Sequence, residues 1–208
     1  MEENKKNGSN HVSISGNIIS GPVFSHEVFG EKIYQMEVQV KRNSGYPDII
    51  PVLAPESMVG VIRGCHGEHI QVVGQYRSYN KHEEKRSRLV LFVFANEILL
   101  AEEYSSGMYN RIFMDGFICR QPEYRVTPNG KEITDVMLAV NRSYHKSDYI
   151  PCICWGKYAR AASRFNIGEH VQAWGRIQSR EYVKKREGLP EEIKIAYEVS
   201  IEDMIPIG

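Results

Sequence analysis

The sequence predicts an all-β protein with short helices, arranged as two tandem five-stranded barrels. Two observations support this fold class: the chain repeats itself at an offset of 100 residues, and β-rich runs dominate both copies. A unit of about 100 residues is a full small domain and is far longer than a solenoid repeat. Identical pairs at this offset include Asn10/Asn110, Gly16/Gly116, Ile18/Ile118, Pro22/Pro122, Gly30/Gly130, Ile33/Ile133, Val40/Val140, Arg42/Arg142, Asp48/Asp148, Ile50/Ile150 and Pro51/Pro151.

A second matching block locates a difference in length between the copies. Residues 67–74 recur as residues 168–175, now at an offset of 101, so one residue has been gained or lost between the two blocks. Such a change is tolerated best in a loop or a short helix. We therefore expect a flexible tail over residues 1–9, a first domain over 10–107 and a second domain over 108–208.

The second copy shows a definite order of elements. Periodicity and turn residues predict strands at 111–118, 132–140, 149–155, 171–179 and 193–201, turn residues over 122–130, a helix over 157–165 and a charged loop over 184–192. The order β-β-β-α-β-β, with one helix between the third and fourth strands, is that of the OB-fold. In this small barrel, the face of strands 2 and 3 and the long loops bind oligonucleotides.

Composition places the chain among globular proteins. It has 208 residues, of which 42% are hydrophobic and 25% charged, so each copy can bury a core. No apolar run approaches the roughly 20 residues that span a bilayer, and residues 1–9 have no apolar signal core. We expect a cytoplasmic protein with no membrane partner.

Cysteines, histidines and catalytic motifs point to no reaction chemistry. The four cysteines form no Cys-x-x-Cys pair, Gly67 interrupts His66 and His69, and alternation along 149–155 places Cys152 and Cys154 on one core-facing side. No nucleophile elbow, phosphate loop or carboxylate pair stands out. We therefore expect no metal, no cofactor and no catalytic residues.

Several motifs of the second copy occur together in an order typical of one family. They are Asn110-Arg111-Ile112 followed by Gly116, the segments 122–130 and 138–144, and Trp155-Gly156-Lys157. Over most of residues 109–203 the chain resembles the bacterial single-stranded DNA-binding protein family. The first copy resembles that family only through its similarity to the second, so we interpret it as a degenerate OB-fold. Family members usually assemble four OB-folds, and by this resemblance two per chain imply a homodimer.

The resemblance also implies which rings stack on bases. The family's stacking positions fall on Tyr144, Tyr149, Trp155 and Tyr182. Alternation supports this independently, since Tyr149, Pro151, Ile153 and Trp155 lie opposite the face of the two cysteines. The alternative for any single aromatic residue is burial in the core.

Basic side chains near these rings are candidates for phosphate contacts. We expect this role for Arg142, Lys157, Arg176, Arg180, Lys184 and Lys185. Overall charge does not decide the question: residues 1–107 hold 11 Lys and Arg against 13 Asp and Glu, a net of −2, and residues 108–208 hold 15 against 13, a net of +2.

The first copy lacks the implied aromatic positions. Ser44, Ile49 and Pro55 stand where the second copy has Tyr144, Tyr149 and Trp155. A different, weaker groove remains open to it, with candidates Arg42, Tyr46, Tyr76, Arg77, Tyr79 and the basic segment 81–88. Equally, the first copy is a candidate surface for assembly or for a protein partner.

The function expected from this pattern is sequence-independent binding and protection of single-stranded DNA in replication, recombination or repair. Its partners would be single-stranded DNA, a second copy of the chain, and replication or repair proteins, within the cytoplasm and at the nucleoid. The alternative is a primosome-like or assembly OB-fold protein that mainly binds protein partners. An OB-fold alone does not specify either function.

Overall fold

The chain forms eleven strands and two short helices in a computed structural model that describes residues 8–42, 44–60, 62, 64, 66–83, 86–101, 110–186 and 189–208. The side chains of residues 83, 86, 184–186 and 189–191 also lie outside the description. The first copy contains β1 (Asn10–Val28), β2 (Glu31–Val40), β3 (Asp48–Pro55), α1 (Glu56–Val59), β4 (His69–Glu83) and β5 (Arg86–Leu100). The second contains β6 (Asn110–Ile118), β7 (Glu123–Val126), β8 (Glu132–Arg142), β9 (Lys146–Trp155), α2 (Lys157–Ala162), β10 (His170–Arg186) and β11 (Leu189–Pro206).

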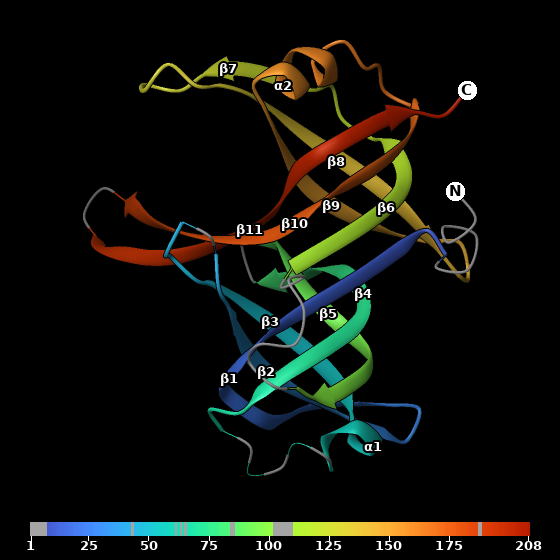
Figure 1. Ribbon diagram of the computed structural model, residues 1–208, viewed down its shortest axis with the longest axis vertical. Helices are drawn as coiled ribbons and strands as arrows, with labels where there is room; N and C mark the ends of the chain where they lie inside the picture. Colours follow the sequence, from blue (N-terminus) through green and yellow to red (C-terminus); the bar gives the residue numbers. More distant parts are fainter. Residues whose placement is uncertain are drawn as a thin grey trace.

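Each copy closes into a five-stranded barrel, stacked one above the other in Figure 1. In the first copy the strands follow the order β2-β3-β5-β4-β1, and the additional β1–β2 pairing closes the ring. The second copy has the equivalent order, β8-β9-β11-β10-β6, and the β6–β8 pairing closes its ring. This is the strand order of the OB-fold, so the predicted fold class is confirmed.

Alternation along the strands builds the two barrel interiors. Successive side chains of a strand point to opposite faces, and in β1 every second residue from Asn10 to Ile18 is buried. The buried set of both copies consists mainly of Val and Ile, which pack well on a pleated surface.

The glycines shared by the second repeated block have a steric reason. A Cβ atom on Gly74 would overlap the carbonyl oxygen of Phe94, and one on Gly175 would overlap that of Ser200. Both glycines lie at a register shift of the long hairpin in their copy, where the strands bend to close the barrel. Only glycine permits this close approach of two backbones.

Three details differ from the sequence prediction. The expected charged loop over 184–192 is mostly paired strand, with Lys184 opposite Glu192, because an exposed two-stranded ribbon accommodates charged residues on both faces. Strand β7 forms within the expected turn, and α2 ends at Ala162 rather than at residue 165.

The one-residue difference between the copies lies in the segment that holds α1, of four residues, and α2, of six. Neither helix is long enough to cross a membrane.

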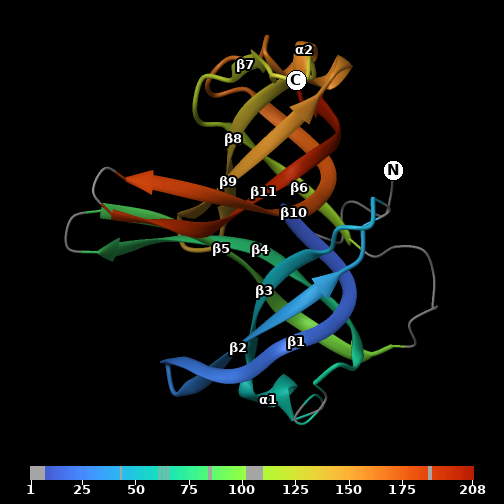
Figure 2. The same cartoon turned by 90° about the vertical axis from the view of Figure 1, so that its left-hand side faces the viewer.

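Strands β1 and β6 join the copies into one continuous sheet. They pair antiparallel with Val12 opposite Ile112, Asn10 opposite Met114 and Ile14 opposite Asn110. Because residue 12 of one copy meets residue 112 of the other, this pairing has a local two-fold axis, as a symmetric dimer interface has. The hairpins β4–β5 and β10–β11 project from the same side of the molecule (Figure 2).

Candidate nucleic-acid interface

Strand β9 carries two of the predicted stacking residues. Tyr149 is 47% exposed, whereas Ile150, Cys152 and Cys154 on the opposite face are buried. Trp155 is half-buried, and its indole Nε1 donates a hydrogen bond to Ser200 Oγ at 3.1 Å. Alternation therefore places both rings on the face that we expected. One residue of that face differs, because Ile153 is only 5% exposed.

The segment after β9 explains why glycine follows Trp155. Gly156 has φ +54° and ψ −120°, a conformation that side chains strongly disfavour, and it ends the strand so that α2 begins at Lys157. The Lys157 ammonium lies 4.8 Å from the centroid of the Tyr158 ring, and the side chain is exposed. Lys157 thus places an exposed cation two residues after Trp155.

The other two predicted stacking residues lie on hairpins. Tyr144 is 91% exposed in the β8–β9 turn, where its φ of +62° is matched by φ +53° at His145. Tyr182 is 38% exposed on β10. The four rings therefore occupy a strand, a turn and a hairpin rather than one compact cluster.

The predicted cation Arg142 lies at the contact between the two copies. Its Nη1 is 3.6 Å from the carboxylate of Asp148, which is 1% exposed. The same carboxylate receives Arg77 Nη1 from the first copy at 3.2 Å and the backbone N–H of Ser78 at 2.7 Å. Ser78 Oγ in turn accepts the N–H of Tyr149 at 2.8 Å. One buried carboxylate thus connects three groups of both copies.

Asp48 makes the equivalent arrangement in the first copy. It is fully buried and pairs with Arg42 of its own copy, at 2.7 Å from Nε, and with Arg176 of the second copy, at 3.3 Å. It also accepts the N–H of Ser179 at 2.7 Å. The carboxylate raises the pKa of the Arg42 guanidinium, chiefly through the hydrogen bond. The predicted phosphate contacts of Arg142 and Arg176 remain predictions, and both side chains have a structural partner at this junction.

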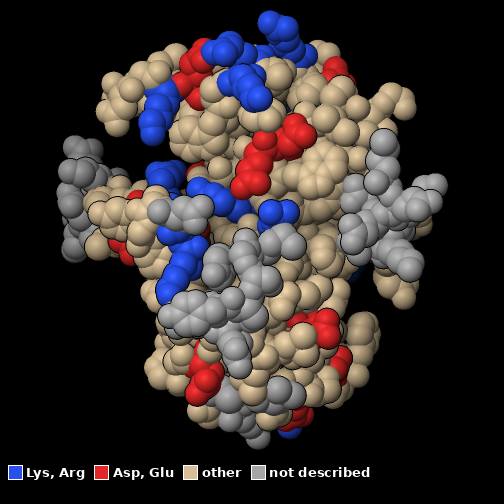
Figure 3. All heavy atoms as spheres, in the orientation of Figure 1, with Lys and Arg blue, Asp and Glu red and all other residues tan. Residues whose placement is uncertain are grey.

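The remaining predicted cations lie on the β10–β11 hairpin. Arg180 is exposed, whereas the side chains of Lys184 and Lys185 lie outside the described residues. In the view of Figure 3, Lys and Arg gather over the second copy and the junction, whereas Asp and Glu appear on both copies.

The aromatic candidates of the first copy have different environments. Tyr46 is 78% exposed, and Tyr79 is 48% exposed with its ring centroid 5.9 Å from that of Phe92. Tyr76 is fully buried in the core, and burial raises the pKa of its hydroxyl well above the usual value. Tyr76 must therefore be removed from the stacking candidates, because no face of its ring is open to a base.

Two of the three cysteines of the second copy, Cys152 and Cys154, are buried in the core. Burial raises the pKa of Cys152 strongly and that of Cys154 to about 12, so both are protonated at neutral pH. Among the described residues, no group of three or more His, Cys, Asp and Glu side chains is placed to hold a metal ion.

Sequence reasoning did not identify two residues beside the candidate site. Phe92 and Tyr197 line a cavity together with Tyr79 and Tyr182. They come from the two hairpin strands β5 and β11, and no repeat or motif marks them in the sequence. The signal that was present is a run of alternating large side chains on β5, which identifies a strand but not what it faces.

Comparisons with known proteins agree with this geometry. Residues 109–206 match the model of the single-strand binding protein family. Over 82 residues the chain is 38% identical to the single-stranded DNA-binding protein of Halalkalibacterium halodurans and 34% identical to single-stranded DNA-binding protein A of Bacillus subtilis. Each alignment covers 36% of this chain, and 49% and 48% of the two relatives, so the chain spans about half the length of the curated relatives it matches.

Solved structures extend the similarity to both copies. The wild-type single-stranded DNA-binding protein of Thermus aquaticus superposes with a TM-score of 0.73 at 21% identity, covering 97% of this chain and 94% of the other. A deletion mutant of the same protein gives 0.76 at 18% identity, with coverage of 97% and 96%. At these identities the likeness establishes the fold.

The fold defines a protein with two OB-folds in one chain. Its second copy, residues 109–206, is similar to the single-strand binding protein family, whose model it matches. The predicted family resemblance is thereby confirmed.

Proposed function

We propose that this chain binds single-stranded DNA without sequence preference and protects it during replication, recombination or repair. One observation carries the proposal: the copy that matches the family model holds aromatic rings on the outer face of β9 and on the β8–β9 and β10–β11 hairpins. Every base has a flat π-face, so exposed rings hold a strand regardless of its sequence. The proposal includes no catalytic step and no cofactor.

The proposed contacts divide into stacking and charge. Tyr149 and Trp155 supply rings on β9, with Tyr144 and Tyr182 on the adjoining hairpins, and Lys157 and Arg180 are exposed cations that meet phosphates. Titrating intrinsic fluorescence with oligo-dT at several salt concentrations tests this division. Binding should weaken as salt rises, because contacts with phosphates release counterions. Double-stranded DNA should bind poorly, since its bases offer no free faces.

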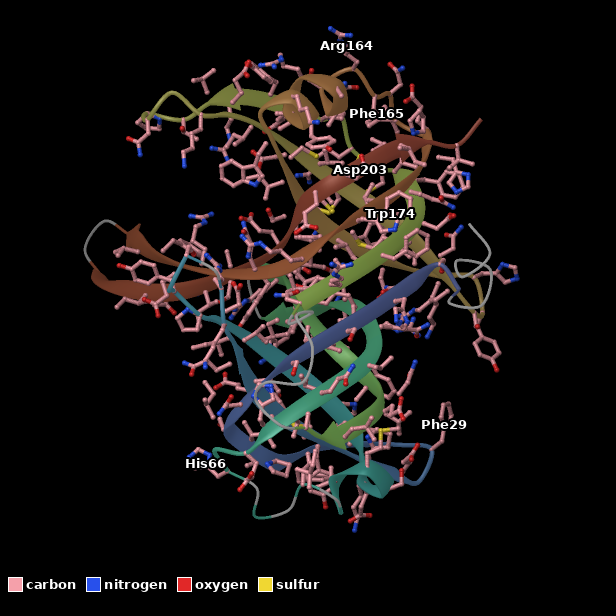
Figure 4. The ribbon with its side chains drawn as sticks, viewed as in Figure 1. Phe29, His66, Arg164, Phe165, Trp174 and Asp203 are labelled. Atoms are coloured by element: carbon pink, nitrogen blue, oxygen red, sulfur yellow. The ribbon has the colours of Figure 1, made fainter. Side chains whose placement is uncertain are left out.

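Replacing Lys157 with alanine should flatten the plot of log affinity against log salt. A neutralised phosphate of a single strand contributes about 0.7 to that slope, so the change should be at most about this size. Affinity for all sequences should fall alike, because a phosphate contact carries no base information. Arg164→Ala is the matched control, since Arg164 is exposed at the far end of the second copy (Figure 4). Equal slopes for the two variants would remove Lys157 from the proposed interface.

We propose that the units divide as expected from the repeat, with a tail over 1–9 and copies over 10–107 and 108–208. The boundary near 107, like most of the tail, lies outside the described residues. The closed barrels on either side of it support the division.

A homodimer with four OB-folds is the proposed assembly. Light scattering should report about 48 kDa, twice the chain mass of 23.9 kDa. The pairing of β1 with β6 is already used inside one chain, so the dimer needs a different surface. A stable monomer at micromolar concentration would contradict this assembly.

A second candidate function, binding a protein partner, has support from the first copy. The β1–β2 hairpin exposes Val23 by 59% and Phe24 by 57% along β1, and Phe29 in its turn is fully exposed and points away from the barrel (Figure 4). Exposed apolar clusters of this kind often mark protein contacts. Phe24→Ser together with Phe29→Ser should leave oligo-dT affinity unchanged; a loss of dimer mass in the same variant would favour the assembly function for this hairpin.

Inside the cell, the proposed place of action is the cytoplasm, at the nucleoid, with replication or repair proteins as further partners. Enrichment on exposed DNA after replication arrest, measured by imaging of the tagged chain, tests this proposal. A uniform distribution under those conditions would argue against it.

A further inference from the structure

A candidate site outside the β9 platform is a cavity between the two copies. It has a volume of about 1030 Å³. One wall is the outer face of the first barrel, with Leu53 of β3 and Phe94 of β5, and the other is formed by the β10–β11 hairpin of the second copy. The two hairpins that frame it project together in Figure 2. Its size reaches the upper end of the range of small-ligand pockets, roughly 300–1,000 Å³.

Aromatic side chains line both walls of this cavity, which we call the inter-copy groove. The first copy supplies Tyr79 and Phe92, whose rings contact each other at a centroid distance of 5.9 Å. The second copy supplies Tyr182 and Tyr197. Tyr197 is half-buried, and burial raises the pKa of its hydroxyl; tyrosine is neutral at physiological pH even without this shift. Neutral rings on two facing walls are suited to flat aromatic ligands.

The charged side chains of the groove favour an anion. Arg77, Arg88 and Arg142 line it, against Glu37 as the acidic residue of the lining. Arg77 and Arg142 share the buried carboxylate of Asp148, so the junction fixes them at the groove wall. Arg88 is exposed on β5 and is the cation that we assign to a phosphate.

We propose that the inter-copy groove is a binding site for one or two nucleotides of a single strand, built jointly by both copies. This inference rests on the proposed function and extends it to the first copy, which lacks the family's stacking positions. Arg142 and Tyr182 line the groove and are also predicted DNA contacts of the second copy, so a strand leaving the β9 platform continues directly into it. This continuity, with facing rings and an excess of arginine, favours DNA over a protein occupant.

Removing rings from either wall tests the joint site. In the full-length chain, Tyr79→Ala and Tyr197→Ala should each weaken binding of fluorescein-labelled oligo-dT by roughly 5- to 150-fold, the range of one lost base–aromatic stack. Tyr79→Phe keeps the ring and should stay within about twofold of the parent chain. Phe29→Ala is the control for a fully exposed ring outside the groove and should leave the affinity unchanged.

Removing a positive charge and removing a negative charge should change the affinity for oligo-dT in opposite directions, a result that misfolding cannot produce. Arg88→Ala should weaken binding, whereas Glu37→Gln should strengthen it, because it removes a carboxylate from the path of the phosphates. A gain in affinity cannot arise from a damaged fold.

The outcomes separate this inference from the proposed function. If Trp155→Ala weakens oligo-dT binding while the Tyr79, Tyr197 and Glu37 variants leave it unchanged, the chain binds DNA but the groove does not. If the groove variants instead alter the mass of the assembly and leave oligo-dT affinity intact, the groove holds protein and the inference is wrong. Loss of all oligo-dT binding by the parent chain would reject both proposals.

Discussion

Asp148→Ala is expected to lower the free energy of unfolding by about 3 kcal/mol, the lower end of the range for breaking a buried ion pair. Its carboxylate is 1% exposed and accepts bonds from Arg77 and from the N–H of Ser78, both in the other copy. Removing it leaves that N–H without its acceptor and leaves Arg77 and Arg142 close together with no counter-charge. We take the lower end because both guanidinium groups are partly exposed and can turn to solvent.

Urea unfolding of the full-length chain at neutral pH measures this effect. Asp135→Ala is the matched control, because Asp135 is 39% exposed and pairs with Arg125, which is 53% exposed. An exposed pair of this kind contributes less than about 1 kcal/mol. Asp48→Ala should behave like Asp148→Ala, since Asp48 has the same set of partners. If Asp148→Ala lowers the free energy of unfolding no more than Asp135→Ala does, the buried carboxylates do not stabilise the junction between the copies.

Trp155→Ala should weaken oligo-dT binding by about 1–3 kcal/mol, the contribution of one stacked base. The salt dependence should stay nearly unchanged, because an aromatic ring releases no counterions. Trp155 is held in place by the bond from its Nε1 to Ser200, so its ring is already oriented before a strand arrives. Fluorescence anisotropy with labelled oligo-dT at several salt concentrations measures both quantities.

Trp155→Phe provides the control for this second prediction. It retains a ring but loses the bond to Ser200, so its affinity should fall between those of the parent chain and Trp155→Ala. Circular dichroism should confirm that both variants keep the strand content of the parent. If a folded Trp155→Ala chain binds oligo-dT as well as its parent, the platform on β9 is wrong and the protein-binding function moves ahead.

The fold was predictable from local pattern, and much of the site was not. Alternation around Ile150 and Cys152 placed Tyr149 and Trp155 on the open face, since a strand constrains side-chain direction at every second residue. Tyr76 was wrongly predicted to stack on bases, because the sequence of its strand did not reveal which face is buried.

Contacts between the copies were beyond the reach of sequence patterns. Asp48 and Asp148 were visible as a repeated pair, yet nothing local indicated that each would bind an arginine of the other copy. The groove residues Phe92 and Tyr197 line one cavity only because two long hairpins project side by side. Such sites depend on the packing of distant segments, which periodicity does not encode.

Covalent fusion of the two barrels has a consequence for how their contact can change. When two identical single barrels associate, every substitution at their two-fold interface occurs in both subunits. Each side chain must therefore be compatible with the same side chain of the partner. In this chain the two sides of the contact are different residues of one sequence, so each can change alone. After Gly74 the chain has Gln75 and Arg77, whereas after Gly175 it has Arg176 and Gln178, with the two residue types exchanged. In both cases the arginine donates to the glutamine and reaches the aspartate of the opposite barrel. Each half can therefore acquire its own surface chemistry while the shared contact persists, a freedom that identical subunits lack.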